Sequence, residues 1–286
     1  MAYISLKNVS YTYPTSEEPT IKNLSVELEK GKFYAVAGAN SSGKTTLCNI
    51  IRGFIPHFYK GDLNGEVWID GKNISEQEFG DLAIKIGYIF QNPFNQISGI
   101  KETVFEELSY GLENFGVPRD EIFQRVGKII ELAHLKSLVN KNPIEMSGGQ
   151  QQLVALASIL VMEPDIFVID EPTSQLDPQG TEEVFKLIKL MKEKGKTIIL
   201  VEHKIDLIAE YADEVIVIKD GELMLQGETK AVLTDERLPE WGVPYTEYTK
   251  LGMSLKNKGF PLKEIPITLN QAVSFIEKRR TNHAIS

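Results

Sequence analysis

The sequence is poor in three features, each of which would indicate a class of protein. It has one cysteine, Cys48, so no intramolecular disulfide can form and a reducing compartment is expected. No apolar run approaches the roughly 20 residues of a membrane-spanning helix, and the first residues lack the apolar core of a signal peptide. Basic residues number 31 against 40 acidic ones, which argues against a dedicated nucleic-acid-binding protein. We therefore expect a cytosolic protein that reaches a membrane only through partners.

The apolar residues occur in short runs, rich in β-branched and aromatic types, that are separated by loops and helical patterns. The runs at 165–170 and 196–201 do not alternate with polar residues, as expected of parallel strands covered on both faces. The first stretches, ISLKNVSYTY and TIKNLSVELEKG, do alternate and predict an antiparallel flank. Apart from the flank, the predicted strands are 33–38, 66–70, 86–90, 165–170, 196–203 and 213–221. The pattern indicates an α/β fold with a parallel core sheet.

Two further segments have helical patterns of their own. Residues from about 92 to 164 predict a helical subdomain inserted between two strands of the core. After a main domain of residues 1–232, residues 233–286 predict a C-terminal helical extension with two short helices. Thr268 is expected to begin the second helix, with Gln271 completing a capping box. This extension is expected to pack on the main body or on another subunit.

The stretch GANSSGKTT, residues 38–46, has the residue types and the setting of a phosphate-binding loop. It follows a predicted strand, precedes a helical pattern, and matches G-x-x-x-x-G-K-[ST]. Backbone N–H groups of Asn40, Ser41, Ser42, Gly43, Lys44 and Thr45 are expected to surround the β- and γ-phosphates of a nucleotide. Lys44 supplies a positive charge, and the Thr45 hydroxyl is a ligand for Mg²⁺. The loop predicts a nucleoside triphosphate site.

Two acids, Asp170 and Glu171, lie at the end of the buried run in DIFVIDE, residues 165–171, and burying them is costly unless a cation or a proton meets them. With a phosphate loop upstream, Asp170 is placed to bind Mg²⁺ through water. Glu171 is then placed beside the γ-phosphate to polarise an attacking water. The pair predicts a hydrolytic site.

His203 and Gln91 follow other strands of the same predicted sheet, at the edge where ligands gather. His203 is expected to donate a hydrogen bond to the γ-phosphate and to hold the water and Glu171 in place. The sequence spacing supports two roles for Gln91 equally. Gln91 either reaches Mg²⁺ and the attacking water, or it caps the turn before Pro93.

A second glycine pair lies in MSGGQQQLVALAS, residues 146–158, at the start of a helical pattern. The first turn of a helix has unpaired N–H groups and the positive end of the helix dipole, so it suits an anion. One chain therefore offers two incomplete anion sites.

Together these motifs resemble the nucleotide-binding subunits of ATP-binding cassette (ABC) transporters. The order is the same: phosphate loop, glutamine loop, S-G-G-Q signature, D-E carboxylates, L-D loop and late histidine, over residues 3 to about 230. The resemblance implies that ATP is hydrolysed with Mg²⁺, that Tyr13 stacks on adenine, and that Thr46 binds phosphate. Tyr11 is a weaker candidate for the adenine contact, and Tyr13 can also be read as a packed aromatic.

In that family two subunits pack head to tail, and the signature of each closes over the ATP bound by the other. The resemblance carries this role to four signature residues and to the aspartate of the L-D loop. They are Ser147, Gly148, Gly149, Gln150 and Asp177.

A narrower resemblance, to the ATPase subunits of energy-coupling factor (ECF) transporters, rests on FQNPFNQ, DEPTSQLDPQG and the short helical tail. It implies a pair of ATPases, of the same or different chains, at the cytoplasmic face of the membrane. Grooves beside the glutamine loop receive helices of an integral membrane coupling subunit, which binds a membrane protein specific for a vitamin or a metal ion. Departures from the usual residues are Ala39, Ser41, Phe94, Met146 and Leu153.

Other functions are consistent with the same cassette. The chain can serve another class of ABC transporter, or act as a soluble ABC ATPase on ribosomes or DNA. The negative charge, the single cassette and the lack of a long coiled-coil insertion argue against the soluble reading. In a third reading ATP acts mainly as a dimerisation switch and a partner chain catalyses.

Overall fold

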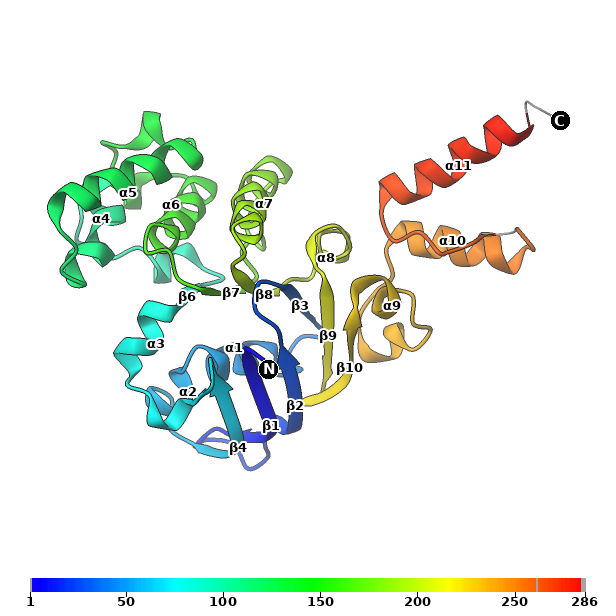
Figure 1. The fold of residues 1–286 in the computed structure, drawn as a ribbon, viewed down its shortest axis with the longest axis horizontal. Coiled ribbons are helices and arrows are strands. Elements are labelled where there is room, and N and C mark those ends of the chain that lie inside the picture. Colours follow the sequence, from blue (N-terminus) through cyan, green and yellow to red (C-terminus); the bar gives the residue numbers. More distant parts are fainter. Residues whose placement is uncertain (1, 261, 284–286) are drawn as a thin grey trace.

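The computed structural model describes residues 2–260 and 262–283 and contains two sheets with helices around them (Figure 1). The N-terminal sheet is antiparallel, in the order β2-β1-β4-β5. Its strands are β1 (Ile4–Thr12), β2 (Ile21–Leu28), β4 (Asp62–Ile69) and β5 (Lys72–Asn73). The alternation of buried and exposed residues along β2 matches the pattern read from the sequence, so the predicted antiparallel flank is confirmed.

The core sheet has the order β10-β9-β3-β8-β7-β6, and all its pairs are parallel except β10 with β9. Its strands are β3 (Phe33–Ala37), β6 (Ile86–Ile89), β7 (Ile166–Asp170), β8 (Thr197–Val201), β9 (Glu214–Lys219) and β10 (Glu222–Glu228). Every residue of β3, β7 and β8 is buried, as the unbroken apolar runs predicted. The predicted α/β fold with a parallel core sheet is confirmed.

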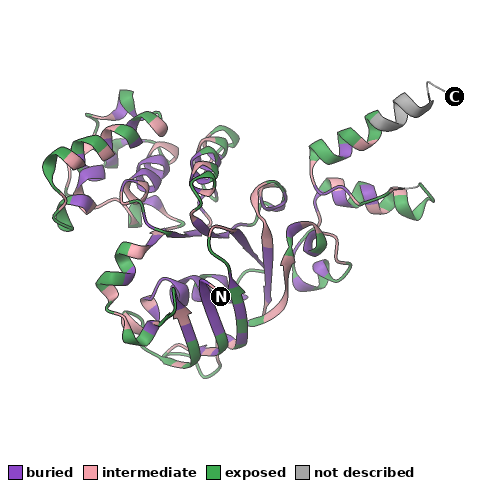
Figure 2. Cartoon of the chain, viewed as in Figure 1, coloured by how far each residue is buried: buried purple, intermediate pink, exposed green. Residues whose placement is uncertain are grey.

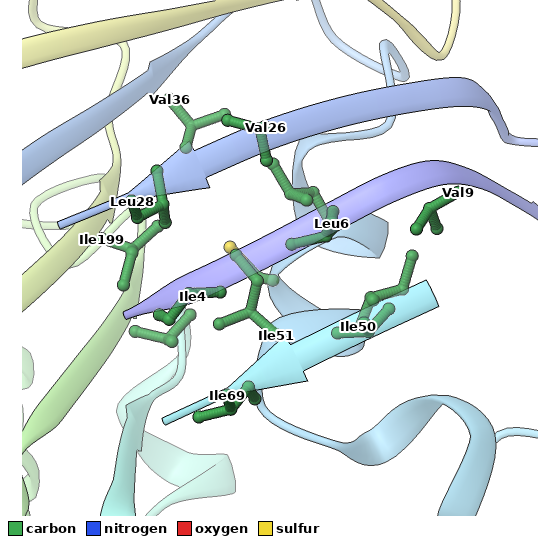
Figure 3. Packing of buried hydrophobic residues seen from close by; sticks show 14 of the residues in the cluster. Ile4, Leu6, Val9, Val26, Leu28, Val36, Ile50, Ile51, Ile69 and Ile199 are labelled. Atoms are coloured by element: carbon green, nitrogen blue, oxygen red, sulfur yellow. The ribbon is translucent and has the colours of Figure 1, made fainter. Parts of the chain in front are cut away.

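Helix α1 (Lys44–Ile51) lies between the two sheets and joins them through one hydrophobic cluster. Figure 3 shows Ile50 and Ile51 of α1 among Ile4, Leu6 and Ile69 of the N-terminal sheet, with Val36 and Ile199 of the core sheet at the left. Because the phosphate loop connects β3 to α1, both ends of that loop are fixed in this core.

The helical subdomain follows β6, as predicted, and covers the other face of the core sheet together with α7. The helices of this part of the chain are α4 (Val104–Asn114), α5 (Arg119–Leu132), α6 (Gly148–Leu160) and α7 (Pro178–Glu193). The shorter helices α2 (Phe54–His57), α3 (Phe79–Lys85), α8 (Ile205–Tyr211) and α9 (Thr229–Leu233) connect strands or follow them. Thr103 begins α4 with a complete capping box that includes Glu106.

The C-terminal extension contains the two predicted helices, α10 (Glu247–Asn257) and α11 (Leu269–His283). They project from the side of the molecule where β10 and α9 lie, and much of their surface is exposed (Figures 1 and 2). Thr268 accepts the N–H of Gln271, as predicted. The Gln271 side chain accepts the N–H of Ile267 instead of that of Thr268, so the predicted capping box is corrected to this arrangement, one residue wider. The domain boundary at residue 232 stays a prediction.

Candidate functional site

The phosphate loop, residues 38–46, begins where β3 ends and runs into the first turn of α1. Gly38 and Gly43 have φ values of +153° and +106°, which L-residues rarely adopt. A Cβ on Gly38 would lie 2.1 Å from the carbonyl oxygen of Ile218, so the loop passes too close to β9 for a side chain. Geometry thus requires glycine at both positions, as the phosphate-loop motif predicts.

Lys44 is 5% exposed and turns back over its own loop. Its Nζ donates to the carbonyl oxygens of Gly38 at 3.0 Å and of Ala39 at 2.8 Å. Burial lowers the pKa of the ammonium, while the carboxylates of Glu171 and Asp170 act in the opposite direction. A buried cation with a lowered pKa gains stability from an anion such as a phosphate.

Asp170 ends β7 beneath the phosphate loop and is buried. It is hydrogen-bonded to the side chain of Thr45, and the hydroxyl of Tyr88 donates to its Oδ2 at 3.2 Å. Burial raises the pKa of this carboxyl. Mg²⁺ prefers oxygen ligands such as carboxylates and hydroxyls. Asp170 and Thr45 therefore fit a magnesium ion that accompanies a nucleotide. Tyr88 was missed by the sequence reasoning.

Glu171 contacts the other two predicted catalytic side chains, His203 and Gln91. His203 Nε2 lies 2.7 Å from Oε1 of Glu171, and Gln91 Nε2 donates to Oε2 at 2.6 Å. Glu171 has φ +46°, an uncommon value for a residue with a long side chain. Its N–H donates to the carbonyl of Val201, which fixes this strained residue beside β8. The structure thus brings together residues that are 80 positions apart in the sequence.

A buried carboxylate behind this cluster was also missed by the sequence reasoning. Glu202 is 4% exposed and accepts three hydrogen bonds. Its Oε2 accepts the hydroxyl of Thr173 at 2.7 Å, and its Oε1 accepts the N–H groups of His203 at 2.8 Å and Lys204 at 3.1 Å. Glu202 therefore ties the loop that carries Glu171 to the loop that carries His203. The only sequence signal was an acid next to the histidine in VEHK.

Tyr13 follows β1 and lies at the margin of the phosphate loop. Its hydroxyl is 3.2 Å from Oγ1 of Thr46, and its ring meets Tyr11 edge to face with ring centres 4.7 Å apart. Tyr11 is fully buried and donates to the carbonyl of Lys60, so it is unavailable for an adenine ring. The half-buried Tyr13 remains the candidate of the two.

The signature residues occupy the N-terminus of α6. Ser147 and Gln150 form a capping box, in which each side chain accepts the backbone N–H of the other. Ser147 and Gly148 are exposed, and Gly149 lies beside Leu176 of the L-D loop. In the part of the chain that the structure describes, no hydrogen bond joins residues 147–150 to the phosphate loop. Asp177 is exposed and caps α7 by accepting the N–H of Gly180 at 2.7 Å.

The described residues, 2–260 and 262–283, contain no group of three or more His, Cys, Asp and Glu side chains placed to bind a metal ion. None of their helices is long and apolar enough to cross a membrane.

A parallel sheet with a phosphate loop on one strand and an Asp-Glu pair on another defines a P-loop nucleoside triphosphatase. The sequence comparisons narrow this class. The model of the family described as "ABC transporter" matches residues 21–174, and the chain belongs to this family. It is an ATPase, and its expected ABC fold is confirmed.

Curated relatives align with nearly the whole chain. A putative ABC transporter ATP-binding protein of Pyrococcus horikoshii is 39% identical over 279 residues, 97% of each chain. The energy-coupling factor transporter ATP-binding protein EcfA2 of Streptococcus thermophilus is 37% identical, over 96% of this chain and 98% of that protein. The predicted resemblance to ECF-type ATPases is confirmed by relatives of that name.

Solved structures agree with the relatives. The cbiO1 protein of Clostridium perfringens, described as part of the ABC transporter complex cbiONQ, superimposes with a TM-score of 0.73 at 31% identity, over 90% of this chain and 97% of that one. A dimeric ATP-binding cassette in a post-hydrolysis state with ADP and Pi gives a TM-score of 0.68 at 31% identity, over 79% of this chain and 98% of that one.

Proposed function

We propose that this chain is the ATP-hydrolysing subunit of an ECF-type importer. It works as half of a head-to-tail ATPase dimer, of the same or different chains, on the cytoplasmic face of the cell membrane. Closure of the dimer on Mg²⁺–ATP drives an integral membrane coupling subunit, which in turn acts on a membrane protein that binds a vitamin or a transition-metal ion. The relatives named as ECF ATP-binding proteins and the cbiO1 structure support this proposal.

The chemistry follows from the cluster around Glu171. The ammonium of Lys44 and the loop N–H groups bind the β- and γ-phosphates, while Thr45, Asp170 and Gln91 supply oxygen ligands toward Mg²⁺ or its water. A magnesium ion held by these residues would neutralise charge that develops on the phosphates. Glu171 then accepts a hydrogen bond from the attacking water, and His203 fixes the orientation of that carboxylate.

The observation that carries the dimer proposal is the pair of glycines at the start of α6. A Cβ on Gly148 would meet no atom of the described residues within 4 Å, and one on Gly149 would make only an ordinary contact at 3.8 Å with Leu176. Neither glycine has a positive φ. Nothing in the described part of the chain therefore requires glycine there. A ligand bound by another subunit and approaching this backbone closely explains the choice.

A groove beside the glutamine loop fits the membrane partner. It has a volume of 430 Å³ and lies between the core sheet and the helical subdomain. Phe90, Gln96 and Ser98 line it on the glutamine-loop side, and the aromatic rings of Phe54 and Phe115 line it elsewhere. A helix of the coupling subunit seated there touches the segment that carries Gln91. Movement of the dimer halves is thereby transmitted to the membrane subunit.

The exposed face of the extension fits a partner ATPase. Leu269, Val273 and Ile276 are 54%, 41% and 49% exposed and recur at the spacing of one face of α11. An apolar stripe of this kind is stabilised by covering it. Contact between the two extensions keeps the subunits together when the nucleotide sites open.

Purification in detergent with matched groove variants tests the proposal. We expect the wild-type chain to co-purify with a coupling subunit and a substrate-binding membrane protein in fixed ratio. Phe115→Glu, at the groove, is expected to lose both, because a charge replaces an apolar contact. Phe123→Glu is the control, because Phe123 is similarly exposed, 50% against 47%, but does not line the groove. Equal recovery with both variants, or no membrane protein with wild type, would contradict the proposal.

A further inference from the structure

A short turn joins the ATPase fold to the C-terminal extension. The 3-10 helix Leu238–Trp241 is followed by Gly242, which has φ +78°. The N–H of Gly242 donates to the carbonyl of Pro239 at 3.1 Å, and that of Val243 donates to the carbonyl of Leu238 at 3.2 Å. These bonds close the turn around a left-handed residue, as at many helix C-termini.

The backbone of this turn touches the phosphate loop. A Cβ on Gly242 would lie 2.8 Å from Cβ of Ala39 and 3.4 Å from its Cα and N. Side-chain carbons essentially never approach one another to 2.8 Å, so the two segments are already in contact with glycine in place. More than 200 residues separate them in the sequence.

The turn is fixed on its other side. Leu238, Trp241 and Val243 are buried in a cluster with Ala35 and Ala37 of β3, the strand that leads into the phosphate loop. The carbonyl of Glu240 accepts a hydrogen bond of 3.1 Å from Nζ of Lys219, at the end of β9. The small alanine side chains of β3 leave room for Trp241. The turn is thus held by a buried cluster and by a hydrogen bond to β9.

Ala39 also takes part in the environment of the phosphate-binding lysine. Its carbonyl oxygen accepts from Lys44 Nζ at 2.8 Å and from the N–H of Ser42 at 3.3 Å. A shift of Ala39 therefore displaces the ammonium of Lys44 and the N–H groups that follow it.

We propose that the turn Leu238–Val243 is a positioning element of the ATP site: by abutting Ala39 it sets the conformation of the phosphate loop and with it nucleotide affinity. The inference rests on the identification of the chain as an ABC ATPase. The turn also begins the segment that carries α10 and α11. Its contact with Ala39 therefore connects the C-terminal extension to the phosphate loop.

The chain offers a matched pair of glycines for the test. Gly242 and Gly259 both have φ +78°, so alanine introduces similar backbone strain at either position. A Cβ on Gly259 would meet no atom within 4 Å in the described residues, whereas one on Gly242 meets Ala39. The difference between Gly242→Ala and Gly259→Ala therefore isolates the contact with the phosphate loop.

The affinity of the full-length protein for ADP with Mg²⁺ is measured by calorimetry, beside thermal unfolding without nucleotide. We expect Gly242→Ala to bind ADP about tenfold more weakly than wild type, a change of about 1.4 kcal/mol, and Gly259→Ala to bind as wild type does. In the Ala39→Gly background, adding Gly242→Ala is expected to cost much less affinity, because the clashing methyl group is absent.

Three results would overturn the inference: Gly242→Ala binding ADP as tightly as wild type, equal losses in Gly242→Ala and Gly259→Ala, or no relief in the Ala39→Gly background. If Gly242→Ala does not fold, Lys219→Met decides instead, since it removes the bond to Glu240 without adding bulk. A wild-type-like affinity of that variant would overturn the inference, and a two- to threefold loss, about 0.5 kcal/mol, would support it. Absence of ADP binding by wild type itself would overturn the ATPase assignment and the inference with it.

Discussion

Glu171 shares its carboxylate between two neighbours, with Oε1 lying 2.7 Å from Nε2 of His203 and Oε2 lying 2.6 Å from Nε2 of Gln91. Each of its oxygens thus contacts a side-chain nitrogen from the end of another strand of the core sheet, β8 for His203 and β6 for Gln91. Each oxygen keeps a second lone pair, which can accept a hydrogen bond from a water. The two contacts together fix the orientation of the carboxylate.

Glu171→Gln should bind ATP and fail to hydrolyse it. The amide keeps the size of the side chain but cannot accept a proton from water, and loss of a general base costs about 10²- to 10⁴-fold in rate. Phosphate release under single-turnover conditions measures the loss, and nucleotide titration of the same sample measures binding. Undiminished phosphate release would remove Glu171 from its assigned role.

Thr173→Val should lower kcat about tenfold with little change in KM for ATP. The substitution leaves buried Glu202 without the hydroxyl that it accepts at 2.7 Å, and an unsatisfied buried group costs about 1–3 kcal/mol. The two loops that carry Glu171 and His203 then lose their connection. Thr173→Ser keeps the hydroxyl and is expected to keep kcat. A loss of equal size in the serine variant would show that the hydroxyl is not the cause.

Gly148→Leu should abolish ATP-dependent association without destabilising the isolated chain, because its side chain would enter open space. Gly127→Leu, in α5, is the control, since a Cβ there also meets no described atom within 4 Å. The control is expected to associate normally and to gain up to about 1 kcal/mol of stability from its helix propensity. Sedimentation with ATP, in the Glu171→Gln background, measures association of the Gly148→Leu and Gly127→Leu variants. Normal association of Gly148→Leu would contradict the composite site.

The ion pair between Asp235 and Arg237 should stabilise the start of the extension above about pH 4 only. The guanidinium of Arg237 lowers the pKa of Asp235 to about 2 in the folded chain, against about 3.9 in an unfolded one. A lowered carboxyl pKa gives stability that is complete above the unfolded value and disappears as the pH falls toward the folded value. The difference in thermal midpoint between wild type and Asp235→Asn should therefore shrink from pH 6 to pH 3. A constant difference would exclude this cause.

The strands and the motifs could be predicted from the sequence because each depends on neighbouring residues. The unbroken apolar runs of β7 and β8 predicted that these strands are buried. The spacing of glycines around Lys44 predicted the phosphate loop. For Gln91, spacing left two readings. The structure adds a contact with Glu171, which links the glutamine to the hydrolytic cluster and leaves its magnesium contact a prediction.

Contacts between distant segments could not be predicted in this way. The bond from Thr173 to Glu202 joins residues 29 positions apart, and both look like ordinary polar residues in the sequence. The contact of Gly242 with Ala39 has no local signature either, because a glycine after a helical turn is expected for capping alone. The side-chain bond of Gln271 is displaced by one residue from the predicted box, because its amide oxygen accepts the N–H of Ile267.

The most direct test of the composite site is the effect of Ser147→Arg in the Glu171→Gln background. ATP affinity of the monomer and ATP-dependent association are measured on the same protein, with Ser137→Arg, also exposed in the helical subdomain, as the charge control. We expect Ser147→Arg to leave the chain's own ATP affinity nearly unchanged and to abolish association, while Ser137→Arg changes neither. Loss of ATP binding by the isolated Ser147→Arg chain would contradict the composite site.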